Sequence, residues 1–277
     1  MLVTLKDVLK IAEAKKLAVG AFNTPNLESL TAVLEAAEER NLPVIIMHAQ
    51  VHEEMGLARL DVMGEIMLSL ADRASVPVCV HLDHGVDLAY VKRGLDMGFT
   101  SVMYDGSELP YEENCANTSI IVELAAQTNA SVEAEIGTLG SREGGEASVS
   151  VYTEPEAAKR FVEETGIDAL ACAFGTAHGI YLKKPKLDFD RLAKIHEIVD
   201  VPLVMHGGSG VSDEDYRRVI DLGIRKINYY TYMAKAGGAG VQQMDDMTFY
   251  HDIALAAKKA MTADVGRAMD IFSGKLK

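Results

Sequence analysis

Eight short apolar, β-branched segments recur along this chain of 277 residues, each separated from the next by a stretch with helical periodicity. Such alternation is typical of parallel βαβ units, and eight of them in a chain of this length predict a closed (β/α)₈ (TIM) barrel. The expected strands are Leu17–Phe22, Val44–His48, Val78–Leu82, Thr100–Tyr104, Ser131–Ile136, Ala169–Phe174, Leu203–His206 and Lys226–Tyr229.

An open doubly wound sheet is the alternative for this alternation. No G-x-G-x-x-G pattern follows the first expected strand, which argues against a dinucleotide-binding sheet. No linker or low-complexity stretch divides the chain, so residues 1–277 are expected to form a single barrel domain. Helix starts are indicated at Thr4, Asn26, Pro155 and Ser212, and the glycine-rich segment Gly237–Gly240 is expected to interrupt the helix after the eighth strand.

Composition and charge exclude several classes of protein. A formal net charge of −14 without a clustered basic face argues against nucleic-acid binding. No apolar run reaches the roughly 18 residues of a membrane span, and charges throughout the N-terminal segment indicate an amphipathic helix, not a signal peptide. The widely spaced Cys79, Cys115 and Cys172 are typical of reduced thiols. We therefore expect a cytoplasmic protein that binds neither nucleic acid nor membranes.

Polar or metal-binding residues stand at the ends of all eight expected strands. In a barrel these carboxyl ends form one face, from which catalytic groups come. One such residue commonly caps a loop, but eight on one face indicate a functional site. The residues are Asn23, His48, Asp83 with His84, Asp105, Glu135, His178, His206 and Asn228.

Three histidines carry the strongest signal, because His84, His178 and His206 each follow an apolar strand and precede glycine. Imidazoles from separate strand ends can converge on one ion and leave a position open to substrate, as in a catalytic zinc site. Other histidines are interpreted as ordinary core or loop residues, namely His52, His196 and His251.

Asp83 directly precedes the first of these histidines. Because adjacent side chains diverge, we expect Asp83 not to share the ion with His84 but to exchange a proton with the substrate. The alternative is that Asp83 orients a histidine by accepting its N–H. His81 points the same way along the strand and is interpreted as packing or as support for the site.

Two loops add to this interpretation. The turn Gly207-Gly208-Ser209 exposes backbone N–H groups before a helix, in the loop where barrels often bind phosphate. The Gly/Ser-rich segment 137–150 is either a surface loop or a lid. A lid would turn on Gly140, Gly144 and Gly145 and deliver Glu143 or Glu146.

Seven motifs along the chain form a recognisable series. They are, in chain order, AFN, HLDHG, VMYDGS, VEAEIG, FGTAHGIYLKKPKLDF, LVMHGGSG and KIN. This series resembles the class II (zinc-dependent) fructose-bisphosphate and tagatose-bisphosphate aldolases, especially the shorter ketose-bisphosphate branch. The resemblance implies a lyase of glycolysis and related carbohydrate metabolism, assembled as a homodimer or homotetramer. Such an enzyme cleaves a phosphorylated ketose, a ketose 1,6-bisphosphate or a related compound, reversibly into dihydroxyacetone phosphate and an aldehyde.

The resemblance also assigns roles at the metal. His84, His178 and His206 would hold Zn²⁺, which would polarise the ketone and hold the charge that develops on cleavage. Asp83 would exchange the proton of the C4 hydroxyl. A loop acid, either Glu143 or Glu146, would handle the C3 proton.

Further matches surround the metal. Asp105 and Glu135 correspond to nearby carboxylates that serve as support or as alternative ligands. A monovalent cation, Na⁺ or K⁺, is implied near the phosphate. The residues that would contact the substrate are Asn23, Gly179, Lys183, Gly207, Gly208, Ser209, Asn228 and Thr231.

The sequence departs from the family pattern at Tyr229 and Tyr230, where the family usually has small residues. Side-chain alternation predicts that one ring faces the barrel mouth and the other packs against a helix. The inward ring is expected to reshape the substrate pocket.

Two other functions fit parts of the pattern. A metal-dependent barrel hydrolase also gathers histidines at strand ends, but commonly has H-x-H on the first strand, where this chain has AFN. A non-catalytic barrel that supports an aldolase partner would need neither Asp83 nor the three histidines.

Overall fold

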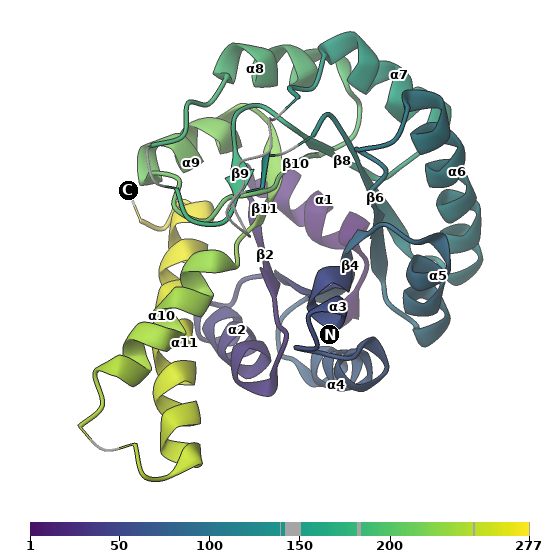
Figure 1. Cartoon of the computed structure of the whole chain (residues 1–277). Coiled ribbons are helices and arrows are strands. Elements are labelled where there is room, and N and C mark those ends of the chain that lie inside the picture. The colour runs from purple at the N-terminus through teal and green to yellow at the C-terminus, as the bar shows by residue number, and fades with distance from the viewer. Residues whose placement is uncertain (139, 142–150, 182–183, 246, 277) are drawn as a thin grey trace.

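The computed structural model describes residues 1–138, 140–141, 151–181, 184–245 and 247–276, and its eight long parallel strands close into a barrel (Figure 1). The last strand pairs with the first, Ile227 opposite Gly20, which closes the sheet. The barrel strands are β2 (Val19–Asn23), β3 (Val44–Ala49), β4 (Val78–Gly85), β5 (Ser101–Tyr104), β6 (Ser131–Ile136), β8 (Ala169–Cys172), β10 (Leu203–Met205) and β11 (Ile224–Asn228). The predicted (β/α)₈ barrel is confirmed, and the largest shift of a strand end is from Leu82 to Gly85.

Helices surround the barrel and cover its outer face (Figure 1). The predicted caps are present, because the side chains of Thr4, Asn26 and Ser212 accept backbone N–H groups and Pro155 occupies a first turn. The outer helices are α2 (Leu27–Arg40), α4 (Leu60–Arg73), α5 (Leu88–Met97), α6 (Tyr111–Thr128), α7 (Pro155–Thr165), α8 (Phe189–Ile198), α9 (Asp213–Asp221) and α11 (Tyr250–Phe272).

Two apolar layers hold this arrangement. Alternate strand residues point outward and pack beneath the helices, while the inward residues meet α1 (Leu5–Lys15), which closes one end of the barrel. Above this end the barrel interior becomes polar. Its buried polar side chains include His81, Ser101, Ser131, Glu133 and Lys226. This polar layer lies between the apolar cluster around α1 and the carboxyl ends of the strands.

The amphipathic N-terminal helix begins after its predicted cap Thr4, and the residues before it form β1 (Leu2–Val3), which pairs with β4. The structure corrects one prediction about helices. The segment Gly237–Gly240 does not interrupt α10 (Thr231–Gln242), which is continuous. The glycines let α10 approach α11, since a Cβ at Gly240 would lie 2.6 Å from that of Ala260.

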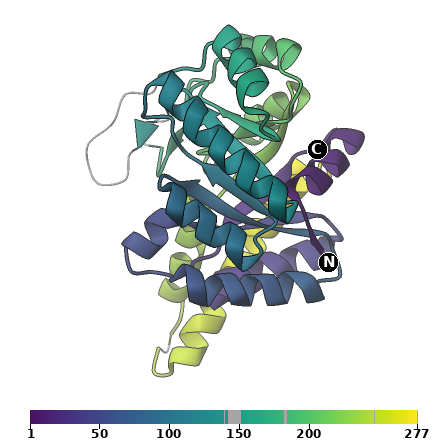
Figure 2. The same ribbon diagram turned by 90° about the vertical axis from the view of Figure 1, so that its right-hand side faces the viewer.

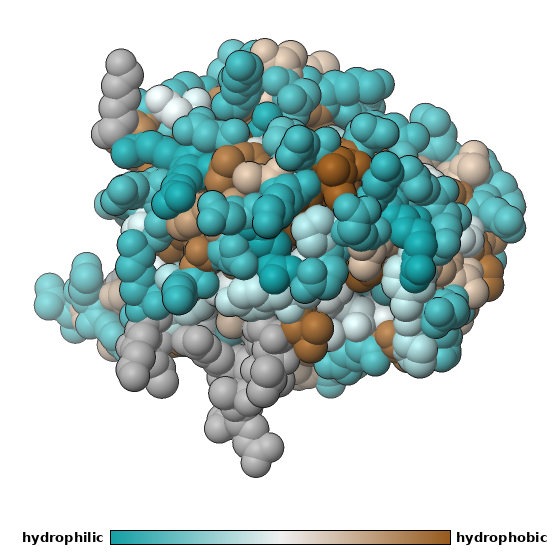
Figure 3. All heavy atoms as spheres, turned by 90° about the horizontal axis from the view of Figure 1, so that it is seen from above, coloured by the Kyte–Doolittle hydropathy of each residue, from teal (hydrophilic) through white to brown (hydrophobic). Residues whose placement is uncertain are grey.

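The two ends of the barrel differ. Both chain termini lie at the end opposite to β7 (Gly140–Ser141), which pairs with β9 (Ala177–His178) beside the mouth (Figure 2). The ends of α10 and α11 that are joined to each other project from the barrel wall (Figures 1 and 2). The face seen from above is mainly hydrophilic, with small separated hydrophobic areas (Figure 3). Within the described ranges, we find no helix with the length and apolarity needed to cross a bilayer.

Candidate active site

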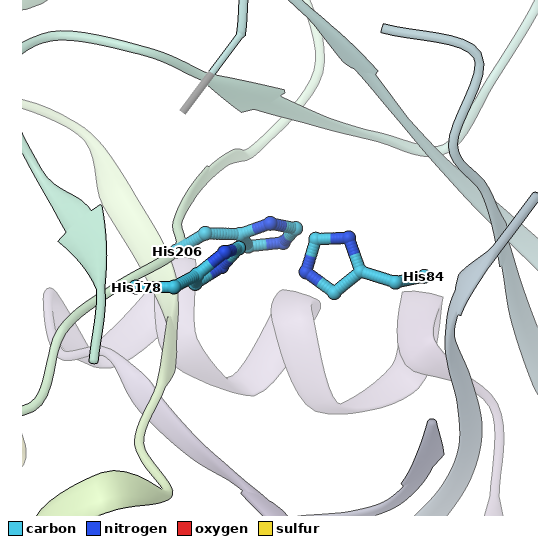
Figure 4. Close-up of side chains that lie close together, drawn as sticks. All are labelled: His84, His178 and His206. Atoms are coloured by element: carbon cyan, nitrogen blue, oxygen red, sulfur yellow. The ribbon is translucent and has the colours of Figure 1, made fainter. Parts of the chain in front are cut away.

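Three imidazole rings meet at the barrel mouth. His84 approaches from one side and His178 and His206 from the other, so that their rings face a common point (Figure 4). The centroid of the His84 ring lies 5.0 Å from that of His178 and 4.6 Å from that of His206. One nitrogen of each ring lies within 4.8 Å of the others, close enough to bind a single ion.

The second nitrogen of two of these rings is occupied by a carboxylate. Nδ1 of His84 lies 2.6 Å from Oδ2 of Asp105, and Nε2 of His206 lies 2.9 Å from Oε1 of Glu133. The rings of His84 and His206 therefore each have one nitrogen next to a carboxylate and one nitrogen directed to the common point. The buried Nδ1 of His206 lies 3.2 Å from Oε2 of Glu135. Histidine rings oriented by a carboxylate are typical of metal sites, so these residues fit a zinc ion.

The charges around the rings also suit a cation. Burial lowers the pKa of His84, but Asp83 and Asp105 outweigh it and raise the pKa to about 10. Burial lowers the pKa of His206 as well, yet hydrogen bonds to Glu133 and Glu135 raise it overall. The carboxylates thus favour positive charge here, and a metal ion would take the place of the protons.

Asp105 and Glu135 form a second possible ligand group with His84. Ligand atoms of His84, Asp105 and Glu135 also lie within 4.8 Å of one another. Asp105 is engaged by Ser107, whose hydroxyl donates to Oδ1 over 2.7 Å, whereas the buried Oε1 of Glu135 has no partner in the described part of the chain. Glu135 is therefore the freer of the two carboxylates to contact an ion.

Asp83 and His84 both face the pocket, although they are neighbours in sequence. Regular strand geometry would turn their side chains to opposite faces. The pairing of β4 with β5 shifts register between Leu82 and Gly85, and His84 has φ +47°, in the left-handed region. This irregularity turns His84 inward beside Asp83, and it corrects the expectation that the two side chains diverge.

Asp83 is 2% exposed, and its carboxylate accepts hydrogen bonds from two side-chain amides, one on β2 and one on β11. Nδ2 of Asn23 donates to its Oδ2 over 2.9 Å, and Nδ2 of Asn228 donates to its Oδ1 over 3.0 Å. Burial raises the pKa of Asp83, but His84 and Lys226 outweigh it and hold the pKa well below its usual range. Asp83 is thus a fixed carboxylate beside the histidines.

Glu133 and Lys226 belong to the site but were not predicted from the sequence. Nζ of Lys226 lies 2.9 Å from Glu133 and 2.7 Å from Oδ1 of Asn228, and all three side chains are buried. His81 lies near them, with Nδ1 2.7 Å from the hydroxyl of Ser101, which agrees with its supporting role. The signal was available, because Glu133 precedes Glu135 and Lys226 precedes Asn228 by two residues on the inward face.

The loops after β10 and β11 meet at the pocket rim. The N–H of Gly208 donates to the carbonyl of Asn228 over 3.0 Å, and the Ser209 hydroxyl accepts the N–H of Tyr230 over 3.1 Å. Gly207 has φ +62°, and a Cβ there would lie 2.5 Å from the carbonyl oxygen of Ala177. Of the predicted substrate contacts, Asn23, Gly179, Gly207, Gly208, Ser209 and Asn228 line the pocket.

The remaining candidates divide into two groups. Thr231 begins α10 next to the pocket but is not part of its lining. Glu143, Glu146 and Lys183 lie outside the described residues, as do the proposed hinges Gly144 and Gly145.

The two tyrosines separate as alternation predicts. The ring of Tyr229 packs edge-on against Phe22 and Phe272, and its hydroxyl donates to Asp264 of α11 over 3.0 Å. The ring of Tyr230 lies 5.0 Å from that of His52 at the pocket wall. Both residues line the pocket, but Tyr230 is the one whose ring packs against His52 there.

Two histidines differ from their predicted roles. His48 stands at a strand end but points away from the mouth, and its Nε2 lies 2.9 Å from the hydroxyl of Tyr90 beneath the helices. His52, interpreted as an ordinary histidine, lines the pocket. His52 lies four residues after His48, on α3 (Gln50–Glu54), and this helix contributes Val51 and His52 to the pocket lining.

The pocket itself has a volume of about 360 Å³. Its lining combines the glycine turn after β10 with an apolar group around α3, which consists of Ala49, Val51, Met55 and Leu57. His84, His178 and Asp83 also line it. No lysine or arginine lines it among the described residues.

Comparisons with known proteins agree with this arrangement. Residues 3–277 match the family described as fructose-bisphosphate aldolase class-II. A 6-phospho-5-dehydro-2-deoxy-D-gluconate aldolase from Halalkalibacterium halodurans is 40% identical over the whole chain and 98% of that protein. The crystal structure of the YdjI aldolase from Escherichia coli K12 matches with a TM-score of 0.89 and 34% identity over all of both chains. A putative fructose-1,6-bisphosphate aldolase from Coccidioides immitis matches with a TM-score of 0.87 and 30% identity, over 98% of this chain and 97% of that one.

Proposed function

Since the chain belongs to the class II fructose-bisphosphate aldolase family, an enzyme family of carbon–carbon lyases, we propose that it is a zinc-dependent aldolase of a phosphorylated ketose. It would cleave this substrate reversibly into dihydroxyacetone phosphate and an aldehyde. The observation that carries the proposal is the convergence of His84, His178 and His206 beside the buried carboxylate of Asp83.

The three histidines would hold Zn²⁺, which supplies electrostatic stabilisation for the negative charge that develops on the ketone oxygen during cleavage. Asp105 and Glu133 would orient two of the rings through their second nitrogens. Glu135, with a free carboxylate oxygen, would serve as an alternative ligand.

Asp83 would take the proton of the C4 hydroxyl as the C3–C4 bond breaks and return it in the synthetic direction. Asn23 and Asn228 fix the direction of its carboxylate, because each donates to one of its oxygens. A loop acid, Glu143 or Glu146, would exchange the C3 proton.

The phosphate of the dihydroxyacetone phosphate part would bind at Gly207, Gly208 and Ser209, with Gly179, Thr231 and Lys183 nearby. Exposed N–H groups in a turn between strand and helix attract anions. A monovalent cation, Na⁺ or K⁺, beside this phosphate is part of the same proposal.

The substrate would carry one phosphate. The pocket lining around α3 is apolar, and among the described residues the pocket offers no lysine or arginine to a second phosphate. The 40% identical relative is named for a substrate with one phosphate and a carboxylate, which supports this choice over a ketose bisphosphate.

The test is to purify the protein, measure its zinc content, and follow cleavage of a panel of phosphorylated ketoses and keto acids by the dihydroxyacetone phosphate released. We expect about one zinc per chain and cleavage that chelation abolishes and added zinc restores. A zinc-free protein that cleaves its substrate equally well would contradict the metal dependence. A zinc-loaded protein that releases no dihydroxyacetone phosphate from any member would contradict the proposed activity.

A further inference from the structure

His52 is a buried polar side chain without a hydrogen-bond partner at its Nδ1. The residue is 5% exposed, and within the described ranges no donor or acceptor pairs with that nitrogen. The ring lies in the pocket wall with Asp83 and Tyr230. Buried polar atoms are nearly always paired, so an unpaired one in a pocket indicates a ligand atom that pairs with it.

The position of the His52 ring is fixed by its surroundings. The ring of Tyr230 lies against it at a centroid distance of 5.0 Å and an angle of 52°. The carbonyl of His52 accepts the N–H groups of Leu57 and Ala58 over 2.8 Å and 3.3 Å. These bonds hold the backbone of His52 in place, and the Tyr230 ring packs against its side chain.

The short helix that carries His52 is anchored to the barrel at several points. Glu53 accepts the hydroxyl of Tyr90 over 2.8 Å and the N–H of Leu60 over 2.9 Å. Oε1 of Gln50 accepts the N–H of Val86 over 3.0 Å, from the loop after β4. A side chain that is held in place by supporting contacts is suited to position a substrate.

Two barrel strands separate His52 from the phosphate loop, and the ring of Tyr230 lies between them. The glycine turn follows β10, whereas His52 follows β3, with β11 and β2 between them. If the phosphate of the dihydroxyacetone phosphate half binds at the turn, the other half of the substrate reaches the apolar lining around α3. This half is the aldehyde that cleavage releases.

We infer that His52 binds the aldehyde half of the substrate through a hydrogen bond to an oxygen atom beyond its carbonyl carbon. The carbon chain of the aldehyde packs against Val51, Met55 and Leu57. The inference rests on the proposed function and adds the substrate class: the aldehyde carries a hydroxyl or carboxylate oxygen on a short chain. Burial lowers the pKa of His52 although Asp83 raises it, so a neutral imidazole N–H donates to either kind of oxygen.

The inference is tested in the synthetic direction with zinc-loaded enzyme, dihydroxyacetone phosphate and two aldehydes of equal size. Glycolaldehyde carries a hydroxyl where propanal carries a methyl group, and 3-oxopropanoate tests a carboxylate. We expect the wild type to prefer glycolaldehyde or 3-oxopropanoate over propanal in kcat/KM by about tenfold or more, as one hydrogen bond allows. His52→Leu loses this preference, and His52→Asn, which keeps a polar atom near the position of Nδ1, restores part of it.

A second measurement separates the two halves of the substrate. Exchange of the C3 proton of dihydroxyacetone phosphate with deuterated water needs no aldehyde, so His52→Leu retains it at the wild-type rate. The matched control is His251→Asn, an exposed histidine on α11, which changes neither readout.

The outcomes are distinct. An unchanged aldehyde preference in His52→Leu, with normal proton exchange, overturns the inference and leaves the proposed function intact. Loss of proton exchange in His52→Leu also overturns it, since His52 would then act on the other half or on the fold. Wild-type enzyme that exchanges no proton of dihydroxyacetone phosphate overturns the proposed function and the inference together.

Discussion

The side-chain amide of Asn228 donates to Oδ1 of Asp83 over 3.0 Å, and so joins the ends of two strands on opposite sides of β2 and β3. Asn23 occupies the other carboxylate oxygen. Both bonds hold the carboxylate at the pocket, and neither involves the ring nitrogens of His84, His178 and His206 that face the common point. In the proposed mechanism this arrangement would separate proton transfer from metal binding, and it leads to the first prediction.

Asp83→Ala is expected to keep its zinc and to retain exchange of the C3 proton of dihydroxyacetone phosphate. Cleavage should fall by about 10²-fold or more, because a general acid–base group at the C4 hydroxyl is lost. Zinc content and the two rates check this. If zinc leaves the Asp83→Ala protein, Asp83 supports the metal and the proton-transfer role is wrong.

His178→Ala is expected to lose zinc and all cleavage while the barrel stays folded. The apolar layers under the helices and around α1 contain none of the three histidines, so the fold does not depend on the ion. Chelation of the wild type should likewise abolish activity with unchanged helical circular dichroism. Stoichiometric zinc in the variant would exclude His178 as a ligand, and unfolding on chelation would show that the ion is structural.

Lys226→Met is expected to lower the free energy of unfolding by about 3–5 kcal/mol, because it leaves the buried carboxylate of Glu133 without its cation. Zinc affinity should fall by about 10- to 100-fold, since Glu133 orients His206. Adding Glu133→Leu should recover part of the stability and none of the affinity. Denaturant unfolding and zinc titration measure both effects. Equal loss of stability in the single and double variants would contradict this account of the pair.

Tyr230→Ala is expected to change the ranking of aldehydes by about 10- to 200-fold in kcat/KM, because it removes a ring from the pocket wall beside His52. Tyr229→Phe is the matched control, since that ring packs on Phe22 and its hydroxyl bonds Asp264. It should keep the ranking and lose about 0.5–1.5 kcal/mol of unfolding free energy. A changed ranking in Tyr229→Phe alone would reverse the assignment of the two rings.

The sequence was sufficient to predict the barrel and to choose the three histidines, because parallel strands in a barrel all end on one face. It was not sufficient to show that His52 lines the pocket and that His48 does not. A shift of one residue turns a strand side chain to the other face, so His48 lies under the helices next to the inward Met47. His52 reaches the pocket through the turn after the strand, which periodicity does not describe.

Irregular backbone and buried charge account for the other differences. The bulge that brings His84 beside Asp83 depends on the pairing of β4 with β5, which only the folded sheet defines. Glu133 and Lys226 were missed because charged residues inside a strand are uncommon in cores. Their two-residue spacing from Glu135 and Asn228 becomes informative once the inward face is known.

His84 has a left-handed backbone conformation, which histidine disfavours. A residue with a Cβ is destabilised there by roughly 1–2 kcal/mol, whereas glycine is not. His84→Gly should therefore be more stable than His84→Ala by about 1 kcal/mol, the reverse of their usual order, as thermal unfolding of the two metal-free variants can show. A screen for thermostability alone would then favour glycine here and return a sturdier barrel without a catalytic centre.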